Sequence, residues 1–165
     1  MILHTESFGT GEPLVFLHNG LLTGLTDFEF QRDHLKDRYH VVLPDLRGHG
    51  ESVSDKLDRF FEDNAADLAE TFDHLGIESA HIIGASLGAL VGIFFAKRYP
   101  AKVKSLVISG VIAEKPDNWP ELHKQETHKW RQILHYAEAV TYYNQMHKAD
   151  WRKFIEMGQS EDWYP

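Results

Sequence analysis

Residues 80–90 read AHIIGASLGAL, and this stretch decides the fold. The apolar run Ala80–Ala85 predicts a buried strand, which passes into Ser86. The apolar stretch Leu87–Tyr99 predicts a helix, because Pro100 then ends the run. A strand that turns directly into a helix is typical of a parallel sheet with helices on its faces.

Ser86 is the candidate nucleophile of this turn. Gly84 and Gly88 flank it in the pattern G-x-S-x-G, and they allow strand and helix to approach closely while the serine adopts a strained conformation. The N-terminus of the following helix favours negative charge beside the hydroxyl. The alternative is a chance glycine-rich turn whose serine caps the helix. The strand before the motif and the helix after it favour the nucleophile.

Strands and helices are predicted to alternate on either side of this motif. The other strands are expected at Ile2–Thr5, Pro13–Leu17, His40–Leu43 and Val103–Ser109, and two more helices at Asp27–Arg38 and through Phe61–Leu75. Gly76 closes the second of these helices. The alternation predicts an α/β fold with a mostly parallel sheet and flanking helices.

The character of the chain changes after Gly110, where tryptophan, tyrosine and histidine gather in helical, polar sequence. We therefore expect residues 1–112 to form the core and residues 113–165 a helical cap or lid segment. The aromatic side chains of this segment would line a binding pocket or pack within the segment itself.

Composition excludes several classes of protein. The 165 residues suit one compact unit, and a net charge of −8 without a basic run argues against nucleic acid as a partner. With no cysteine, a thiolate metal site is excluded, and His123 and His128 are spaced unlike a zinc motif. We expect neither a metal nor another cofactor. No apolar segment suggests a membrane span or signal peptide, which predicts a cytoplasmic protein.

Three motifs in order resemble the α/β-hydrolase family over about residues 8–110. They are Gly9-x-Gly11-x-Pro13-Leu14 leading to Leu17-His18-Asn19-Gly20, Asp45-Leu46-Arg47-Gly48-His49-Gly50-x-Ser52, and Gly84-x-Ser86-x-Gly88. The resemblance implies a serine hydrolase that forms an acyl-enzyme on Ser86, with the nucleophile after the fifth strand of the sheet.

The resemblance also implies an oxyanion hole made of two backbone N–H groups. One maps to Leu87, and the other maps to Gly20 or to its neighbour Asn19. Asn19 stands where the family generally has glycine, so both positions remain candidates. Such donors stabilise the negative charge of a tetrahedral intermediate.

Other polar residues near these motifs have a structural and a catalytic interpretation. His18 and His49 could act as bases, but their place in the resembling proteins is in loop structure. Asp45 and Arg47 could supply an acid and an electrophile, although fixing the turn after the preceding strand is the favoured interpretation.

The triad acid and histidine are expected to be missing. In the family they follow the serine, in that order, after later strands. Glu114 is a weak candidate for the acid, and the later histidines are expected to be solvated or to pack the cap: His123, His128, His135 and His147. We expect a truncated chain that is nearly inactive alone and leaves Val103–Ser109 as an exposed edge.

Three functions are compatible with these features. The first is a serine hydrolase of an ester, thioester or similar small acyl substrate. The second is a binding module for small molecules that has the fold without turnover. The third is half of a split enzyme, completed by a C-terminal fragment or by another copy in a homo-oligomer.

Overall fold

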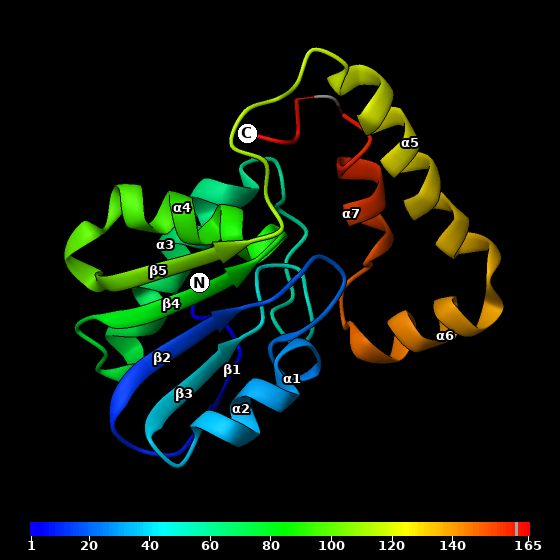
Figure 1. Cartoon of the computed structure of the whole chain (residues 1–165). Coiled ribbons are helices and arrows are strands. Elements are labelled where there is room, and N and C mark those ends of the chain that lie inside the picture. Colours follow the sequence, from blue (N-terminus) through cyan, green and yellow to red (C-terminus); the bar gives the residue numbers. More distant parts are fainter. Residues whose placement is uncertain (161) are drawn as a thin grey trace.

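The computed structural model describes residues 1–160 and 162–165, and its centre is a five-stranded sheet in the order β1-β3-β2-β4-β5 (Figure 1). The strands are β1 (Thr5–Phe8), β2 (Glu12–Leu17), β3 (Tyr39–Pro44), β4 (Ala80–Ala85) and β5 (Val103–Ser109). Only β1 runs antiparallel to its neighbour. The sheet and its helices confirm the predicted α/β architecture.

Apolar side chains of the central strands alternate between two cores. In β2, Leu14 and Phe16 belong to one cluster, whereas Val15 and Leu17 belong to the other. Successive residues of a strand point to opposite faces, so a strand covered on both faces must be apolar throughout. This explains why the central strands are visible in the sequence as uninterrupted apolar runs.

Helices cover both faces of the sheet. They are α1 (Gly24–Asp27), α2 (Glu29–Leu35), α3 (Phe60–Leu75) and α4 (Leu87–Arg98). Helices α3 and α4 share one face, where Phe72 meets Phe95 at 5.3 Å between ring centroids. Gly76 ends α3 in the left-handed conformation, as predicted.

Two predicted elements are wrong in detail. The strand expected at Ile2–Thr5 lies at Thr5–Phe8, because the Leu3 N–H bonds to Thr71 of α3 and takes the first residues away from the sheet. The helix expected at Asp27–Arg38 is divided between α1 and α2, because Phe28 turns inward and packs 4.8 Å from Phe16. Burial of one aromatic ring thus overrides local helix propensity.

The nucleophile motif follows β4, the fourth strand of this chain. The resemblance implied the fifth strand, whereas β1, β2 and β3 are the strands described before β4. The motif still lies beside the middle of the sheet, since β4 pairs with β2 on one side and with β5 on the other.

The described residues of the C-terminal helical segment, 113–160 and 162–165, lie beyond the carboxyl ends of the parallel strands (Figure 1). The segment contains α5 (Trp119–Gln132), the short 3-10 turn η2 (Ile133–His135), α6 (Ala137–Met146) and α7 (Arg152–Met157). Phe154 of α7 joins it to the core by stacking on His49 at 3.9 Å. No helix in the described part of the chain is long and apolar enough to cross a membrane.

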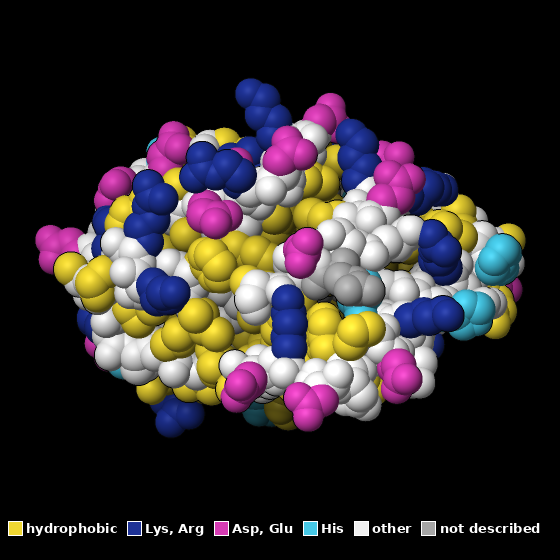
Figure 2. Space-filling model, turned by 90° about the horizontal axis from the view of Figure 1, so that it is seen from above, with side chains coloured by type: hydrophobic (Ala, Val, Ile, Leu, Met, Phe, Trp, Pro, Cys, Tyr) yellow, Lys and Arg dark blue, Asp and Glu magenta, His cyan; other side chains and the backbone are white. Residues whose placement is uncertain are grey.

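Strand β5 exposes apolar side chains at the edge of the sheet. Its one hydrogen-bonded neighbour among residues 1–160 and 162–165 is β4. Val107 is 55% exposed and Ile108 42% exposed. Hydrophobic side chains gather on this side of the core when the molecule is seen from above (Figure 2).

Candidate active site

Ser86 has a strained backbone at the turn from β4 to α4. Its φ and ψ are 49° and −112°, and it is one of two non-glycine residues with positive φ in the described part of the chain. Its N–H donates to the Ser109 carbonyl at 2.8 Å, which joins the turn to the end of β5. Such strain persists only where the surrounding structure enforces it, and it is typical of active sites.

Glycines make room for this turn on three sides. A side chain at Gly84 would collide with the backbone of α4, and one at Gly88 would overlap the Leu17 carbonyl of β2. Gly110 has φ +70° and lies directly beside Ser86. Close packing therefore excludes a side chain at Gly84 and Gly88, and the positive φ of Gly110 would strain any other residue there.

The first N–H groups of α4 face the site without helical partners. The Ser86 carbonyl accepts from Ala89 and Leu90 within the helix, whereas the N–H groups of Leu87 and Gly88 precede the first helical bond. Gly20 lies against Leu87, because a side chain on Gly20 would touch Leu87 Cβ at 3.9 Å. The predicted Leu87 and Gly20 positions are thus neighbours in space.

In the loop after β2, the backbone N–H groups of Asn19 and Gly20 differ in their hydrogen bonding. The Asn19 N–H donates to Asp27 Oδ2 at 2.7 Å, and its side-chain amide donates to the same oxygen. The Asn19 carbonyl accepts from His18 Nδ1 at 2.7 Å. The Gly20 N–H has no hydrogen-bond partner among the described residues. Sequence reasoning did not find Asp27 as the residue that holds this loop.

His18 and His49 are both fully buried in the core. His18 accepts from the Leu46 N–H at Nε2, 2.9 Å away, so both of its ring nitrogens serve loop structure. His49 Nδ1 lies 3.3 Å from the Arg47 carbonyl, and its Nε2 has no partner among the described residues. Burial lowers the pKa of both imidazoles, most strongly for His49, which also lies near His18 and His147.

Asp45 and Arg47 fix the loop after β3, as the favoured interpretation of the sequence predicts. Asp45 accepts from the N–H groups of Gly24 and Glu51 at 3.0 Å each. The Arg47 guanidinium donates to both carboxylate oxygens of Asp67, at 2.7 and 2.9 Å. Neither residue lines the cavity beside Ser86.

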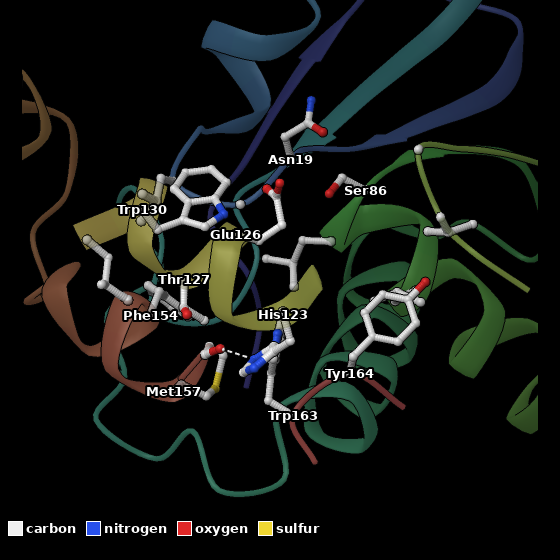
Figure 3. Close-up of a pocket in the computed structure, with 18 of the residues that line it drawn as sticks. Asn19, Ser86, His123, Glu126, Thr127, Trp130, Phe154, Met157, Trp163 and Tyr164 are labelled. Carbon is white, nitrogen blue, oxygen red and sulfur yellow. Dashed lines mark hydrogen bonds between the residues drawn. The ribbon is translucent and has the colours of Figure 1, made fainter. Parts of the chain in front are cut away.

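A cavity of about 520 Å³ opens between Ser86 and the C-terminal helical segment. Ser86 is exposed and lies on the core side, while α5, α6, α7 and the last residues contribute the opposite wall (Figure 3). That wall carries the side chains of Trp119, Leu122, His123, Glu126, Thr127, Trp130, Tyr143, Phe154, Ile155, Met157, Trp163 and Tyr164. Cavities of this size and apolar character suit small organic ligands.

The remaining candidate acid and bases are not brought to Ser86. Glu114 is exposed and outside the cavity wall. His123 faces the cavity but bonds the Gly158 carbonyl at 2.8 Å (Figure 3). His128 and His135 are exposed on the C-terminal helical segment.

Among residues 1–160 and 162–165, no histidine or carboxylate is hydrogen-bonded to the Ser86 hydroxyl, and no cluster of three potential metal ligands occurs. His147 was predicted to be solvated or to pack the cap. It instead bonds backbone groups of two core loops.

A strained serine after a parallel strand, facing a cavity at the carboxyl edge of the sheet, is typical of an α/β hydrolase. The family model described as alpha/beta hydrolase fold matches residues 13–153. The chain therefore belongs to this family of hydrolases.

Among its relatives is a pimeloyl-[acyl-carrier protein] methyl ester esterase of Chromobacterium violaceum, which is 38% identical over 126 residues. That match covers 73% of this chain and 46% of the relative, so the chain spans about half of its length.

Two solved structures are also similar to this chain. A marine microorganism esterase has a TM-score of 0.66 at 26% identity, over 96% of this chain and 62% of that one. An N-acyl homoserine lactonase, AidH, complexed with N-butanoyl homoserine, has a TM-score of 0.62 at 31% identity, over 69% of this chain and 43% of that one.

Proposed function

We propose that Ser86 is the nucleophile of a serine hydrolase that cleaves an ester, thioester or similar small acyl substrate. The observation that carries this proposal is the strained, exposed serine at the mouth of an apolar cavity. A serine that only capped α4 would accept a hydrogen bond from the helix, and Ser86 makes no such side-chain bond.

The oxyanion hole would consist of the N–H groups of Leu87 and Gly20. Neither N–H has a hydrogen-bond partner among the described residues, and the two residues are neighbours. Asn19 was an equal candidate from the sequence, but its N–H is engaged by Asp27. Preorganised donors of this kind contribute about 3–4 kcal/mol each to transition-state stabilisation.

The acid and the histidine of the triad would come from polypeptide that packs against β5. The exposed apolar side chains of Val107 and Ile108 support such a covering. In the reaction, that histidine takes the Ser86 proton as Oγ bonds to the acyl carbon, and then protonates the departing alcohol or thiol. Water next cleaves the acyl-enzyme, which releases the acid and restores Ser86.

The substrate would place its acyl group in the cavity beneath the C-terminal helical segment. The aromatic wall favours an apolar chain or ring, because burial of such surface contributes roughly 25 cal/mol per Å². Relatives that act on a methyl ester and on N-acyl homoserine lactone support an acyl substrate. Residues 1–112 would then form the core and residues 113–165 the cap.

Covalent labelling with a fluorophosphonate tests the proposal. The 165-residue chain and a form extended by any downstream reading frame are incubated with the probe, and adducts are counted by intact mass. We expect one adduct on the extended form, none on its Ser86→Ala variant and an unchanged adduct on Ser7→Ala, an exposed serine of β1.

Each other result has a clear meaning. Labelling of the 165-residue chain alone would show that a base comes from within it or from a second copy. An absence of labelling in every form would contradict the serine hydrolase and favour the binding module.

A further inference from the structure

His147 connects the C-terminal helical segment to two loops of the core. It follows α6 and is almost completely buried. Its Nδ1 accepts from the Gly50 N–H at 2.9 Å, and its Nε2–H donates to the Leu21 carbonyl at 3.0 Å. Both ring nitrogens therefore bind backbone groups, and neither contact can be replaced by water without opening the interface.

The Leu21 contact lies beside the proposed oxyanion donor. Leu21 has φ +63°, which only a few per cent of non-glycine residues adopt. The preceding Gly20 has no side chain that could anchor it, and the Asn19 N–H is fixed by Asp27. The Gly20 N–H is thus held between two fixed points, at Asn19 and at the Leu21 carbonyl.

The Gly50 contact is reinforced by the backbone. The Lys148 N–H donates to the Gly50 carbonyl at 3.0 Å, so both polar groups of Gly50 bond to consecutive residues of the helical segment. Gly50 also lies against the Asp45 carboxylate, which ties it to the loop after β3. This second anchor fixes the position of His147 relative to the core.

We propose that His147 is a positioning residue that holds the oxyanion loop in its reactive conformation through the Leu21 carbonyl. The proposal rests on the proposed role of Gly20, and it makes the helical segment part of the reacting geometry as well as a wall of the cavity. Catalytic donors must be oriented before the reaction, so a loop released at Leu21 would lose transition-state stabilisation more than substrate binding.

The contacts require the neutral ring with its proton on Nε2. A protonated ring would direct an N–H at the Gly50 N–H and break that bond. The titratable groups around His147 are the His49 ring at 5.6 Å, the Tyr143 ring at 6.2 Å, the Asp45 carboxylate and the His18 ring. Burial lowers its pKa, and the Leu21 carbonyl and Asp45 oppose that shift only in part.

Two conservative variants separate the contacts. The amide nitrogen of glutamine can reach the place of Nε2 and keep the bond to Leu21, whereas asparagine reaches only the place of Nδ1, beside Gly50. His135→Asn is the matched control, because His135 is exposed on the same segment. Amide hydrogen exchange over residues 19–22 is measured for each variant, together with the rate of phosphonate labelling at Ser86 in the extended form.

We expect exchange about fivefold faster in His147→Asn, the factor that loss of one hydrogen bond predicts, and exchange near the parent value in His147→Gln. Labelling should slow about tenfold in His147→Asn, less than the ~100-fold loss on removal of a whole donor. If ester turnover is measurable, kcat should fall while KM changes little.

Equal exchange and labelling in both variants and in the control would overturn the proposal. If His147→Asn does not fold, acidification of the parent protein still tests the proposal. On acidification, residues 19–22 must lose protection at the pH at which the ¹⁵N shifts of His147 report protonation, and unchanged protection would overturn the proposal. Changed exchange without labelling of Ser86 in the extended form would reject the proposed function while retaining the role of His147 in the loop.

Discussion

His18 Nδ1 donates to the Asn19 carbonyl at 2.7 Å, and that carbonyl shares a peptide group with the Gly20 N–H. The peptide is trans, so its C=O and N–H point in opposite directions. The hydrogen bond from His18 therefore sets the direction of the proposed oxyanion donor, while the bond from Leu46 to Nε2 keeps the ring in the required tautomer.

His18→Ala should lower the free energy of unfolding by about 2–4 kcal/mol, because the buried Leu46 N–H and Asn19 carbonyl lose a partner. Urea denaturation measures the change. His74→Ala, at an exposed position of α3, should stay within about 0.5 kcal/mol. Equal stability of the two variants would contradict the structural role of His18.

Gly88→Ala should cost about 3 kcal/mol or more, since its methyl group would overlap the Leu17 carbonyl and force β2 and α4 apart. Gly76→Ala meets nothing within 4 Å and should cost only the ~1–2 kcal/mol of a left-handed alanine. Urea denaturation measures both changes in the free energy of unfolding. The rate of phosphonate labelling at Ser86 should fall only in Gly88→Ala. Loss of labelling in Gly76→Ala would show that global stability, rather than the turn, controls reactivity.

Asp67→Ala should destabilise the fold by about 3–5 kcal/mol, because the largely buried Arg47 guanidinium keeps its charge but loses its bidentate partner. Asp73→Ala removes the more exposed pair with Lys102 and should cost no more than about 1 kcal/mol. Thermal and urea unfolding of both variants measure how much each ion pair contributes to stability. A small effect at Asp67 would mean that Arg47 reaches solvent.

Stability should fall as the pH drops below about 6.5, the usual pKa of histidine in an unfolded chain. Burial lowers the pKa values of His18, His49 and His147 in the folded state, so between the two pKa values the unfolded chain binds more protons. Their contribution is complete above that range and is lost towards acid. Unfolding free energies from pH 8 to pH 5 test this, and a flat profile would refute it.

Val107→Lys should reduce self-association of the chain, because charge on an exposed edge strand opposes pairing with another edge. Val53→Lys is the matched control, since both valines are 55% exposed and Val53 lies in a loop away from β5. Sedimentation velocity over a concentration series measures the difference. Equal behaviour of the two variants would indicate that β5 does not mediate association.

The sequence predicted the parts of the fold that depend on local pattern. Strand β4, Ser86 and Gly76 were predicted because apolar runs and glycines fix the backbone near them in the chain. The break at Phe28 could not be predicted, since a helix pattern does not say which aromatic ring the sheet will bury. The start of the first strand could not be predicted either, because Leu3 leaves the sheet for a contact with a residue 68 positions away.

The candidate site was predictable only in part for the same reason. The motif around Ser86 is local, whereas the bonds of His147 join residues 97 and 126 positions apart. A lone histidine in a polar helical segment has no pattern that indicates such partners. The choice between Asn19 and Gly20 likewise depended on Asp27, whose carboxylate reaches the loop only after folding. The cytoplasmic location stays a prediction.

The cavity is bounded by two kinds of structure that can change at different rates in evolution. The geometry of Ser86 depends on backbone and glycines, which tolerate almost no replacement. The opposite wall is built from side chains of the C-terminal helical segment, many of them partly exposed. A descendant of this protein could therefore acquire a new substrate by drift in that wall while its chemistry stayed the same. His147 lies in the same helical segment but outside that wall, and drift at this position would disturb the chemistry as well.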